Sequence, residues 1–423
     1  MNHEYASLQV GEQEGYSRRR FLGGALRAAA AAPVLAAAGS LAADRPAQEA
    51  RPNLPLRKIK LGLVGCGGRG SWIAQLFKQH GGYELHAVAD YFRRNADKCG
   101  DALGVDRTRR FSGLSGYKRV IESGVEAVAL IVPPCFLPEQ SAAAADAGLH
   151  VYMAKPVAVD VPGCLRVETA GKQATQKQRV FFVDYQIPTD PVNIQVAERI
   201  RKGEFGKPTK VITVGINPGR PDPPKTADIE SRLENLVWDN DITIGGSFGV
   251  SYDIHAIDAA IWVLGQRPVA AMGSSRICRL DPHGDSHDVC SIVFEYADGL
   301  IHEHSGLALP SGINDELGCK VVGQKGYGWV NYWRNARFQL HGQEPMIADI
   351  VNLYEAGATR NIASFHDEVV AGHFENPTVR RAVDGCLTCI LGREAAFRHG
   401  RLTMDELLKA NKRIEVDRSG LKV

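Results

Sequence analysis

The sequence lacks a regular cysteine pattern and an excess of either charge. Its nine cysteines are odd in number and unevenly spaced, whereas a small secreted domain held by disulfides carries an even set at regular spacing. Lysine and arginine total 50 and aspartate and glutamate total 48, which leaves a formal net charge of +2. A nucleic-acid-binding face needs clustered basic residues. We therefore expect neither a disulfide scaffold nor a nucleic-acid partner.

The chain also lacks a leucine-rich run that would anchor it stably in a membrane. The most apolar stretch, residues 23–43, is mainly alanine, and Arg27 interrupts it, so it would hold a bilayer poorly. The basic segment Ser17-Arg18-Arg19-Arg20-Phe21-Leu22 precedes this stretch. A basic segment followed by an apolar one is typical of an export signal, and the arginine pair before Phe-Leu resembles a twin-arginine signal.

We expect residues 1–43 to be a twin-arginine signal, cleaved after Ala42 or Ala43, and residues 44–57 to be a polar linker. The resemblance implies the twin-arginine export machinery as a partner and a periplasmic or other extracytoplasmic location. Twin-arginine export carries folded proteins, often with their cofactor already bound. A cofactor loaded before export would be held tightly, because free NAD is scarce outside the cytoplasm.

The composition of the whole chain is that of a soluble globular protein, with 44% hydrophobic and 23% charged residues in 423. This length is sufficient for two domains. Cys386 and Cys389 form the one CxxC, inside the apolar stretch Val383–Leu391. We interpret them as two small buried side chains one helical turn apart; a redox or metal pair is the alternative.

A dinucleotide-binding unit follows the linker. Ile59–Val64 is a short apolar run that predicts a buried parallel strand, and Gly65-Cys66-Gly67-Gly68-Arg69-Gly70 satisfies the GxGxxG pattern. A helix is expected to begin inside this loop, and Tyr83–Ala89 predicts a second strand that ends at Asp90. Strand, glycine loop, helix, strand and acid in this order predict binding of NAD or NADP.

Each part of the unit has a physical task. Gly65 makes the tight turn, Gly67 lets the backbone approach the pyrophosphate, and Gly70 allows the helix to pack close to the strand. The free N–H groups at the helix N-terminus attract the phosphates. Asp90 lies about twenty residues beyond Gly70, where a carboxylate accepts hydrogen bonds from the ribose hydroxyls.

Asp90 favours NAD, because a carboxylate repels the 2′-phosphate of NADP. Arg93 and Arg94 follow closely and are either a solvated helix face or a receptor for that phosphate, so NADP stays possible.

Strands continue to alternate with helices up to residue 182. Val125–Val132 predicts a strand that ends at Pro133, Glu139–Ala147 predicts a helix, and His150–Met153 predicts a strand followed by Lys155. This alternation predicts an α/β Rossmann domain over residues 58–182, with a doubly wound parallel sheet that binds ligands at the carboxyl ends of its strands. The predicted cofactor-binding residues are Gly65, Gly67, Gly68, Arg69, Gly70, Asp90, Arg94, Pro133 and Lys155.

From Lys58 to its C-terminus the chain resembles the Gfo/Idh/MocA family, the glucose–fructose oxidoreductase and inositol dehydrogenase group. The motifs that carry the resemblance are Gly65–Gly70, Ala129–Pro134, Ala147–Pro156, Tyr185–Pro191, His255–Asp258 and Val322–Gly326. It implies that residues 183–423 form a second α/β domain with an open, mostly antiparallel sheet, which builds the substrate site. The resemblance also implies a homo-oligomer. Two alternating runs, Cys290–Tyr296 and Leu300–Ser305, are typical of a hairpin in such a sheet.

The resemblance assigns Lys155 and His255 as the catalytic residues. Oxidation of a carbinol needs a base for the hydroxyl proton, which suits histidine, and a lysine can stabilise negative charge on the reacting oxygen. Some family positions differ here: Ala154 replaces the Glu before the lysine, Ser251 replaces an Asp four residues before the histidine, and Leu137 replaces a His that many members carry.

Four further residues are candidates for contact with the substrate: Tyr185, Asp253, Asp258 and His287. For Tyr185, core packing is an equal alternative. His287 belongs to the Asp/His-rich segment Asp281–Asp288, and His302 and His304 alternate on a strand and so share a face. The order of these residues matches no metal-ligand spacing, so we expect a polar loop near a sugar site and no metal.

The predicted function is an exported NAD(P)-dependent oxidoreductase that acts on a hydroxyl of a sugar, polyol or glycoside. One alternative is an NAD-dependent glycosidase or lyase that works by oxidation and elimination without net redox change. Such relatives often carry Glu-Val-Pro where this chain has Ala154-Lys155-Pro156, which disfavours this alternative. The other is a catalytically silent sugar- or nucleotide-binding protein, and the presence of both Lys155 and His255 argues against it.

Overall fold

The structure is a computed structural model that describes residues 57–220, 222, 225, 228–234 and 238–423. The predicted signal and nearly all of the predicted linker lie outside the described residues. Within these ranges, no helix combines the length and the hydrophobicity that crossing a membrane would need.

In the described part of the chain, six parallel strands form a sheet in the order β3-β2-β1-β4-β5-β6. Their bounds are β1 Ile59–Val64, β2 Tyr83–Asp90, β3 Arg110–Ser112, β4 Ala127–Leu130, β5 His150–Ala154 and β6 Phe181–Asp184. The helices between them are α1 Gly68–His80, α2 Arg93–Leu103, α3 Gly116–Ile121, α4 Leu137–Asp146 and α5 Val161–Gln176. The order reverses between β1 and β4, which is where a doubly wound sheet binds its ligand. The predicted Rossmann fold is confirmed.

The second sheet is mixed and mostly antiparallel, and its described strands follow the order β14-β13-β12-β11-β7-β10-β9-β8-β15. Their bounds are β7 Pro208–Asn217, β8 Ala270–Arg276, β9 Val289–Glu295, β10 Ile301–Ala308, β11 Glu316–Gly323, β12 Gly326–Asn331, β13 Asn335–Leu340, β14 Met346–Asp349 and β15 Leu402–Thr403. The predicted hairpin is the antiparallel pair β9–β10, whereas β10 and β7 run parallel. Residues along β10 alternate between exposed and buried, so one face of the sheet is covered and the other is open.

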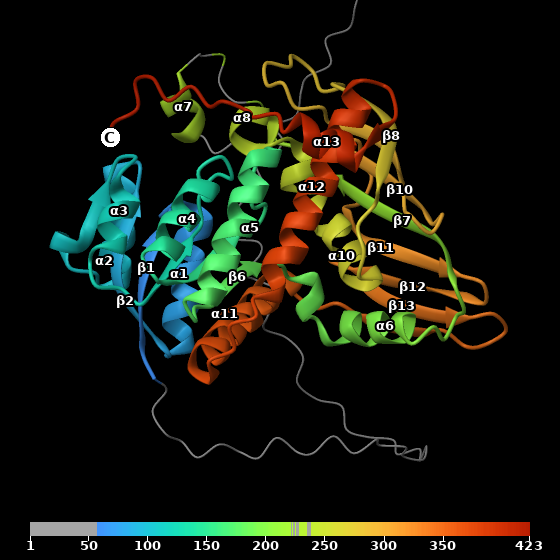
Figure 1. The fold of residues 1–423 in the computed structure, drawn as a ribbon, viewed down its shortest axis with the longest axis horizontal. Coiled ribbons are helices and arrows are strands. Elements are labelled where there is room, and N and C mark those ends of the chain that lie inside the picture. The colour runs from blue at the N-terminus through green and yellow to red at the C-terminus, as the bar shows by residue number, and fades with distance from the viewer. Residues whose placement is uncertain (1–56, 221, 223–224, 226–227, 235–237) are drawn as a thin grey trace, which may run out of the picture. The chain divides into compact units, whose positions relative to one another are not determined.

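The remaining helices are α6 Pro191–Arg201, α7 Ile229–Glu234, α8 Ile242–Gly245, α9 Phe248–Ser251, α10 Ile254–Leu264, α11 Leu353–Ala371, α12 Pro377–Phe397 and α13 Met404–Ala410. Helix α12 runs between the two sheets and packs against both (Figure 1). It buries Cys386 and Cys389, which agrees with their interpretation as small core side chains.

Helix α11 returns to the first sheet. Its Ile362 and Phe365 pack with Phe77 of α1, and the Tyr83 hydroxyl donates a 2.8 Å hydrogen bond to the Ile362 carbonyl. The predicted boundary between residues 182 and 183 falls inside β6, and helix α11, which follows most of the second sheet, completes the core of the first. This shared core fixes the strand ends of both sheets relative to each other.

Candidate active site

The glycine loop leaves no room for side chains at two of its positions. Gly65 has a φ of +95°, and a Cβ placed on it would lie 2.1 Å from the Ile131 carbonyl oxygen. A Cβ on Gly70 would lie 1.8 Å from the Gly65 carbonyl oxygen. A Cβ on Gly68 would meet nothing within 4 Å. The loop therefore packs tightly against the sheet on one side and leaves the N-terminus of α1 open on the other.

A pocket lies against this loop at the carboxyl ends of the strands. It is lined by Gly65, Gly67, Asp90 and Pro133, and its apolar walls include Leu114 and Phe136. Four of the predicted cofactor-binding residues thus meet in one place. Apolar walls suit an adenine ring, and an open helix N-terminus suits a pyrophosphate, so the residues present fit a dinucleotide.

The carboxylate of Asp90 is held in place at the edge of this pocket. One oxygen accepts the Cys66 N–H at 2.7 Å, and the other accepts the Phe92 N–H at 2.9 Å and the Asn95 side-chain amide at 3.1 Å. Burial raises the pKa of Asp90, although these hydrogen bonds oppose the rise.

Arg94 forms an ion pair with Glu234 of α7, and Glu234 also lines the pocket. The arginine that the sequence leaves as a possible receptor for the 2′-phosphate is thus paired with a carboxylate. Glu234 is far away in the sequence, and no sequence pattern points to it.

Arg69 extends from the glycine loop toward the second domain. Its guanidinium makes a 3.1 Å ion pair with Asp184 at the end of β6, and it lies over the rings of Trp72 and Tyr354, with 5.4 and 5.0 Å between the guanidinium carbon and the ring centroids. Asp184 also accepts a 2.6 Å hydrogen bond from the Asn361 amide. Arg69 therefore has a fixed place beside the catalytic candidates.

Lys155 and His255 approach each other from the two domains. Lys155 follows the end of β5, and its ammonium donates a 2.5 Å hydrogen bond to the Ser251 carbonyl just before α10. His255 lies in the first turn of α10 and is buried. Burial, together with the nearby positive charge of Arg69, lowers the pKa of Lys155 to about 8.

The imidazole of His255 is neutral near pH 7. Its pKa is well below the usual value because of burial and of the nearby positive charges of Lys155 and Arg69. Its ring makes edge contacts with Tyr185 and Tyr332, at 6.1 and 5.1 Å between centroids. Among the described residues, its Nδ1 has no hydrogen-bond partner. A neutral histidine with a free nitrogen beside a lysine ammonium can accept a proton from a bound hydroxyl.

Asp258 and Tyr185 lie behind His255 rather than in an open cavity. Asp258 is fully buried and pairs with the Arg381 guanidinium at 2.9 Å, and Arg381 also lies over the ring of Tyr185, at 5.6 Å from its centroid. Burial raises the pKa of Asp258 to about 6 even though Arg381 opposes the rise. The predicted substrate contacts of both residues remain predictions.

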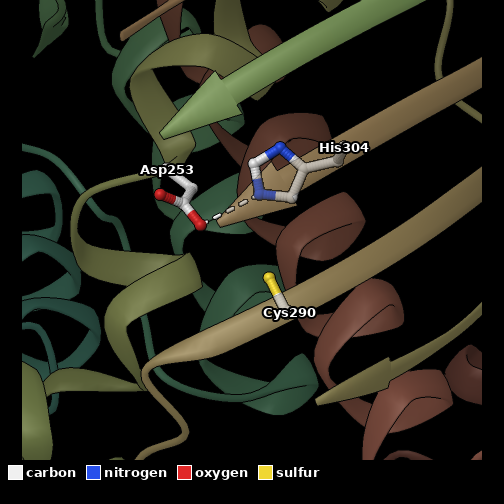
Figure 2. A group of neighbouring side chains, drawn as sticks. All are labelled: Asp253, Cys290 and His304. Atoms are coloured by element: carbon white, nitrogen blue, oxygen red, sulfur yellow. Dashed lines mark hydrogen bonds and ion pairs between the residues drawn. The ribbon is translucent and has the colours of Figure 1, made fainter. Parts of the chain in front are cut away.

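Asp253 points into the covered face of the second sheet. Figure 2 shows its carboxylate directed at the imidazole of His304 on β10, with the thiol of Cys290 on β9 nearby. The carboxylate accepts a 2.9 Å hydrogen bond from Nε2 of His304. His302 and His304 share a buried face of the strand, as their alternation predicts.

His287 lies between β8 and β9, where its Nδ1 is 2.7 Å from the Ser275 hydroxyl and its ring contacts Phe397 at 4.1 Å between centroids. The neighbouring Asp288 accepts hydrogen bonds from two main-chain N–H groups, those of Cys278 and Arg279. These contacts fix the Asp/His-rich loop, and the contact of His287 with a substrate stays a prediction.

Two family models match the chain. One is described as the oxidoreductase family GFO/IDH/MocA, NAD-binding Rossmann fold, and matches residues 59–185. The other is the GFO/IDH/MocA C-terminal domain and matches residues 194–328. Together they cover more than half of the chain.

Two curated relatives are inositol 2-dehydrogenases. That of Rhizobium meliloti is 24% identical over 243 residues, which are 57% of this chain and 66% of the relative, slightly under two thirds of its length. That of Burkholderia lata is 25% identical over 280 residues, or 63% of this chain and 72% of the relative.

Solved structures share the fold. An aldose–aldose oxidoreductase from Caulobacter crescentus complexed with glycerol has a TM-score of 0.68 and 20% identity, and the match covers 82% of this chain and 100% of that one. An inositol dehydrogenase homolog from Azotobacter vinelandii complexed with NAD⁺ also has a TM-score of 0.68 and 20% identity, with 82% and 97% covered.

Proposed function

Because the chain belongs to the Gfo/Idh/MocA oxidoreductase family and has its NAD-binding Rossmann domain, we propose that it oxidises a hydroxyl of a sugar, polyol or glycoside with NAD. The convergence of Lys155 and His255 beside the glycine loop carries this proposal. The names of the similar proteins, inositol 2-dehydrogenase and aldose–aldose oxidoreductase, support the substrate class.

Bound NAD supplies the hydride acceptor. The glycine loop, the N-terminus of α1 and Asp90 would hold it. His255, neutral and with a free Nδ1 in the described structure, takes the hydroxyl proton as the carbinol is oxidised. The Lys155 ammonium hydrogen-bonds the same oxygen and stabilises the negative charge that develops on it. Arg69, fixed by Asp184, adds positive charge beside both groups.

The test uses the purified full chain and a panel of inositols, aldoses and glycosides, and it follows reduced nicotinamide and product identity together. We expect a Lys155→Met variant to lose roughly 10²–10⁴-fold in kcat while its affinity for NAD falls much less. Lys172→Met is the matched control, because this lysine is exposed on α5 and pairs only with a neighbouring side chain of its own helix, Glu168, in the structure described.

Full activity of the Lys155→Met variant would overturn the proposed site. Cleavage of a glycoside without net formation of reduced nicotinamide would replace the dehydrogenase with a redox-neutral lyase that uses the same residues.

We further propose that the protein is exported with NAD bound, since the N-terminal sequence resembles a twin-arginine signal. We also propose a homo-oligomer formed through the open face of the second sheet. Met272, Ile301 and Ile347 are exposed apolar side chains on β8, β10 and β14, and apolar groups on an open sheet face favour burial against a second copy.

A further inference from the structure

The contact between Asp253 and His304 lies next to the catalytic candidates but uses neither of them. Asp253 is two residues after Ser251, whose carbonyl holds Lys155, and two residues before His255. Its own carbonyl accepts the Ala256 and Ile257 N–H groups at 2.9 and 3.1 Å and so starts α10. Any displacement of residue 253 therefore moves both reactive groups.

The second sheet is shaped to receive this side chain. Gly215 of β7 and Gly306 of β10 are register partners. A Cβ on Gly215 would lie 1.8 Å from one carboxylate oxygen of Asp253, and a Cβ on Gly306 would lie 2.6 Å from the other. The two glycines thus form a hollow in the covered face, and the carboxylate fills it.

The next inward-facing register pair, Thr213 and His304, holds the carboxylate in the hollow. His304 directs Nε2 to Asp253 at 2.9 Å and Nδ1 to the Thr213 hydroxyl at 3.0 Å. That hydroxyl is also 2.7 Å from Nε2 of His302. Because burial lowers the pKa of His302 to about 3, His302 is neutral and its Nε2 can accept the hydroxyl proton.

This chain of contacts orients His304 with N–H groups toward both Thr213 and Asp253. Although burial opposes it, the negative charge of Asp253 raises the pKa of His304 to about 10. Burial raises the pKa of Asp253, and the charge of His304 opposes that rise, so the contact favours the charged forms of both side chains. Among the described residues, the titratable groups that face this pair include Cys290 of β9, His302 of β10, Cys389 of α12 and Tyr252.

We infer that Asp253 is a positioning residue, and that its ion pair with His304 holds the segment carrying Ser251 and His255 against the second sheet. We call this ion pair the anchor. The inference rests on the proposed function, because the role of the anchor is to place Lys155 and His255 for catalysis. The Cys290 sulfur lies within 4.8 Å of the paired atoms, but the direct 2.9 Å contact between Asp253 and His304 is that of a hydrogen-bonded ion pair.

The experiment compares Asp253→Asn, His304→Gln and the double variant with the wild-type full chain. We expect each single variant to lose about 10- to 10²-fold in kcat, with the dissociation constant of NAD and the KM for substrate changed much less. The double variant should lose no more than the worse single one, because both changes break the same contact.

A third single variant, Gly306→Ala, tests the hollow while it keeps both charged groups. Its methyl group would displace the carboxylate of Asp253, so we expect the same loss of kcat. Gly400→Ala is the matched glycine control, since a Cβ there has only ordinary contacts of 3.6 Å or more. Glu303→Gln is the control on β10, because that side chain is exposed and pairs with Lys210.

A labelling assay that needs no substrate tests this inference independently of the proposed function. Lys155 is modified with an amine-acylating reagent, and its labelling rate is followed by mass spectrometry. In the anchor variants we expect faster labelling of Lys155, because the Ser251 carbonyl no longer holds its ammonium, and no change at Lys172. If the wild type oxidises no substrate but this difference appears, the anchor stands and the proposed function fails.

Labelling rates and kcat equal to those of the wild type in all three single variants would overturn the inference. A stoichiometric metal ion that co-purifies with the wild type and is lost in His304→Gln would also overturn it. In that case Asp253 and His304 would be ligands rather than an anchor.

Discussion

The Lys155 ammonium and the Ser251 carbonyl form a 2.5 Å hydrogen bond that joins the end of β5 to the segment before α10. Burial lowers the pKa of Lys155 to about 8; Arg69 and Arg220 lower it as well, while Asp239 and Asp184 oppose them. The lysine therefore loses its charge just above neutral pH.

We expect kcat to fall as the pH rises through about 8, because a neutral amine cannot stabilise negative charge on the reacting oxygen. In a Lys155→Arg variant the group stays charged, so activity should be lower overall but should not fall in this range. The measurement is kcat against pH with saturating NAD for both proteins. A wild-type kcat that rises through the same range would assign Lys155 as the base instead.

The buried ion pair of Asp258 and Arg381 leads to a second prediction, which concerns the free energy of unfolding. Removing the guanidinium in Arg381→Met leaves a fully buried carboxylate uncompensated, so we expect a loss of about 3–5 kcal/mol in the free energy of unfolding at neutral pH. Burial already raises the pKa of Asp258 to about 6. A raised pKa favours the protonated acid in the folded state. Protonated Asp258 therefore adds to the free energy of unfolding below about pH 4, and this contribution is lost as the pH rises.

In the variant the pKa of Asp258 rises further, because Arg381 no longer lowers it. The loss in the free energy of unfolding of Arg381→Met relative to the wild type should therefore be small near pH 4 and should grow toward neutral pH. Urea unfolding at several pH values measures it. Asp258→Asn in the same background should recover most of the loss at neutral pH. Arg380→Met is the control, since that side chain is 91% exposed, and an equal deficit there would contradict the prediction.

Much of the nucleotide site was predictable because its signal is local. Gly65, Gly70 and Asp90 belong to one continuous unit in which spacing fixes the geometry, and the structure places its strands and helix within a residue or two of the predicted bounds. The position of Lys155 at the end of a parallel strand was predicted as well, since β5 ends at Ala154; its catalytic role stays a prediction.

Contacts between distant parts of the chain were not predictable. His304 lies 51 residues from Asp253. No local sequence pattern around either residue indicates that they pair, because the pairing depends on the register of β7 with β10. The return of α11 to the first sheet was missed for the same reason: its apolar residues suit a helix in either domain, and only tertiary packing decides which sheet they cover.

The N-terminal sequence predicts dependence on the twin-arginine pathway. Lysine keeps the charge of arginine but not its geometry, so we expect an Arg18→Lys, Arg19→Lys variant to remain in the cytoplasm as the uncleaved precursor. Arg20→Lys, outside the predicted pair, should be exported like the wild type. Cell fractionation and the mass of the mature protein measure both outcomes, and export of the double variant would show that another pathway carries the chain.

The ion pair of Arg94 and Glu234 predicts the choice between NAD and NADP. Glu234 lines the nucleotide pocket and forms an ion pair with the Arg94 guanidinium, which the 2′-phosphate of NADP would need as its own partner. In Glu234→Gln that guanidinium is released, and hydrogen bonds between charged groups contribute about 1.5–3 kcal/mol. We therefore expect the affinity for NADP to rise roughly tenfold or more, with the affinity for NAD little changed, as measured by calorimetric titration of cofactor-free protein.

The matched control for this prediction is Asp97→Asn, which releases the neighbouring Arg93 from its 3.0 Å ion pair on α2. Because Arg93 is not the arginine that Glu234 holds, its release should leave the preference for NAD as it is. Equal gains of NADP affinity in the two variants would mean that net charge near Asp90 sets the preference. No gain in Glu234→Gln would mean that Asp90 alone excludes the 2′-phosphate.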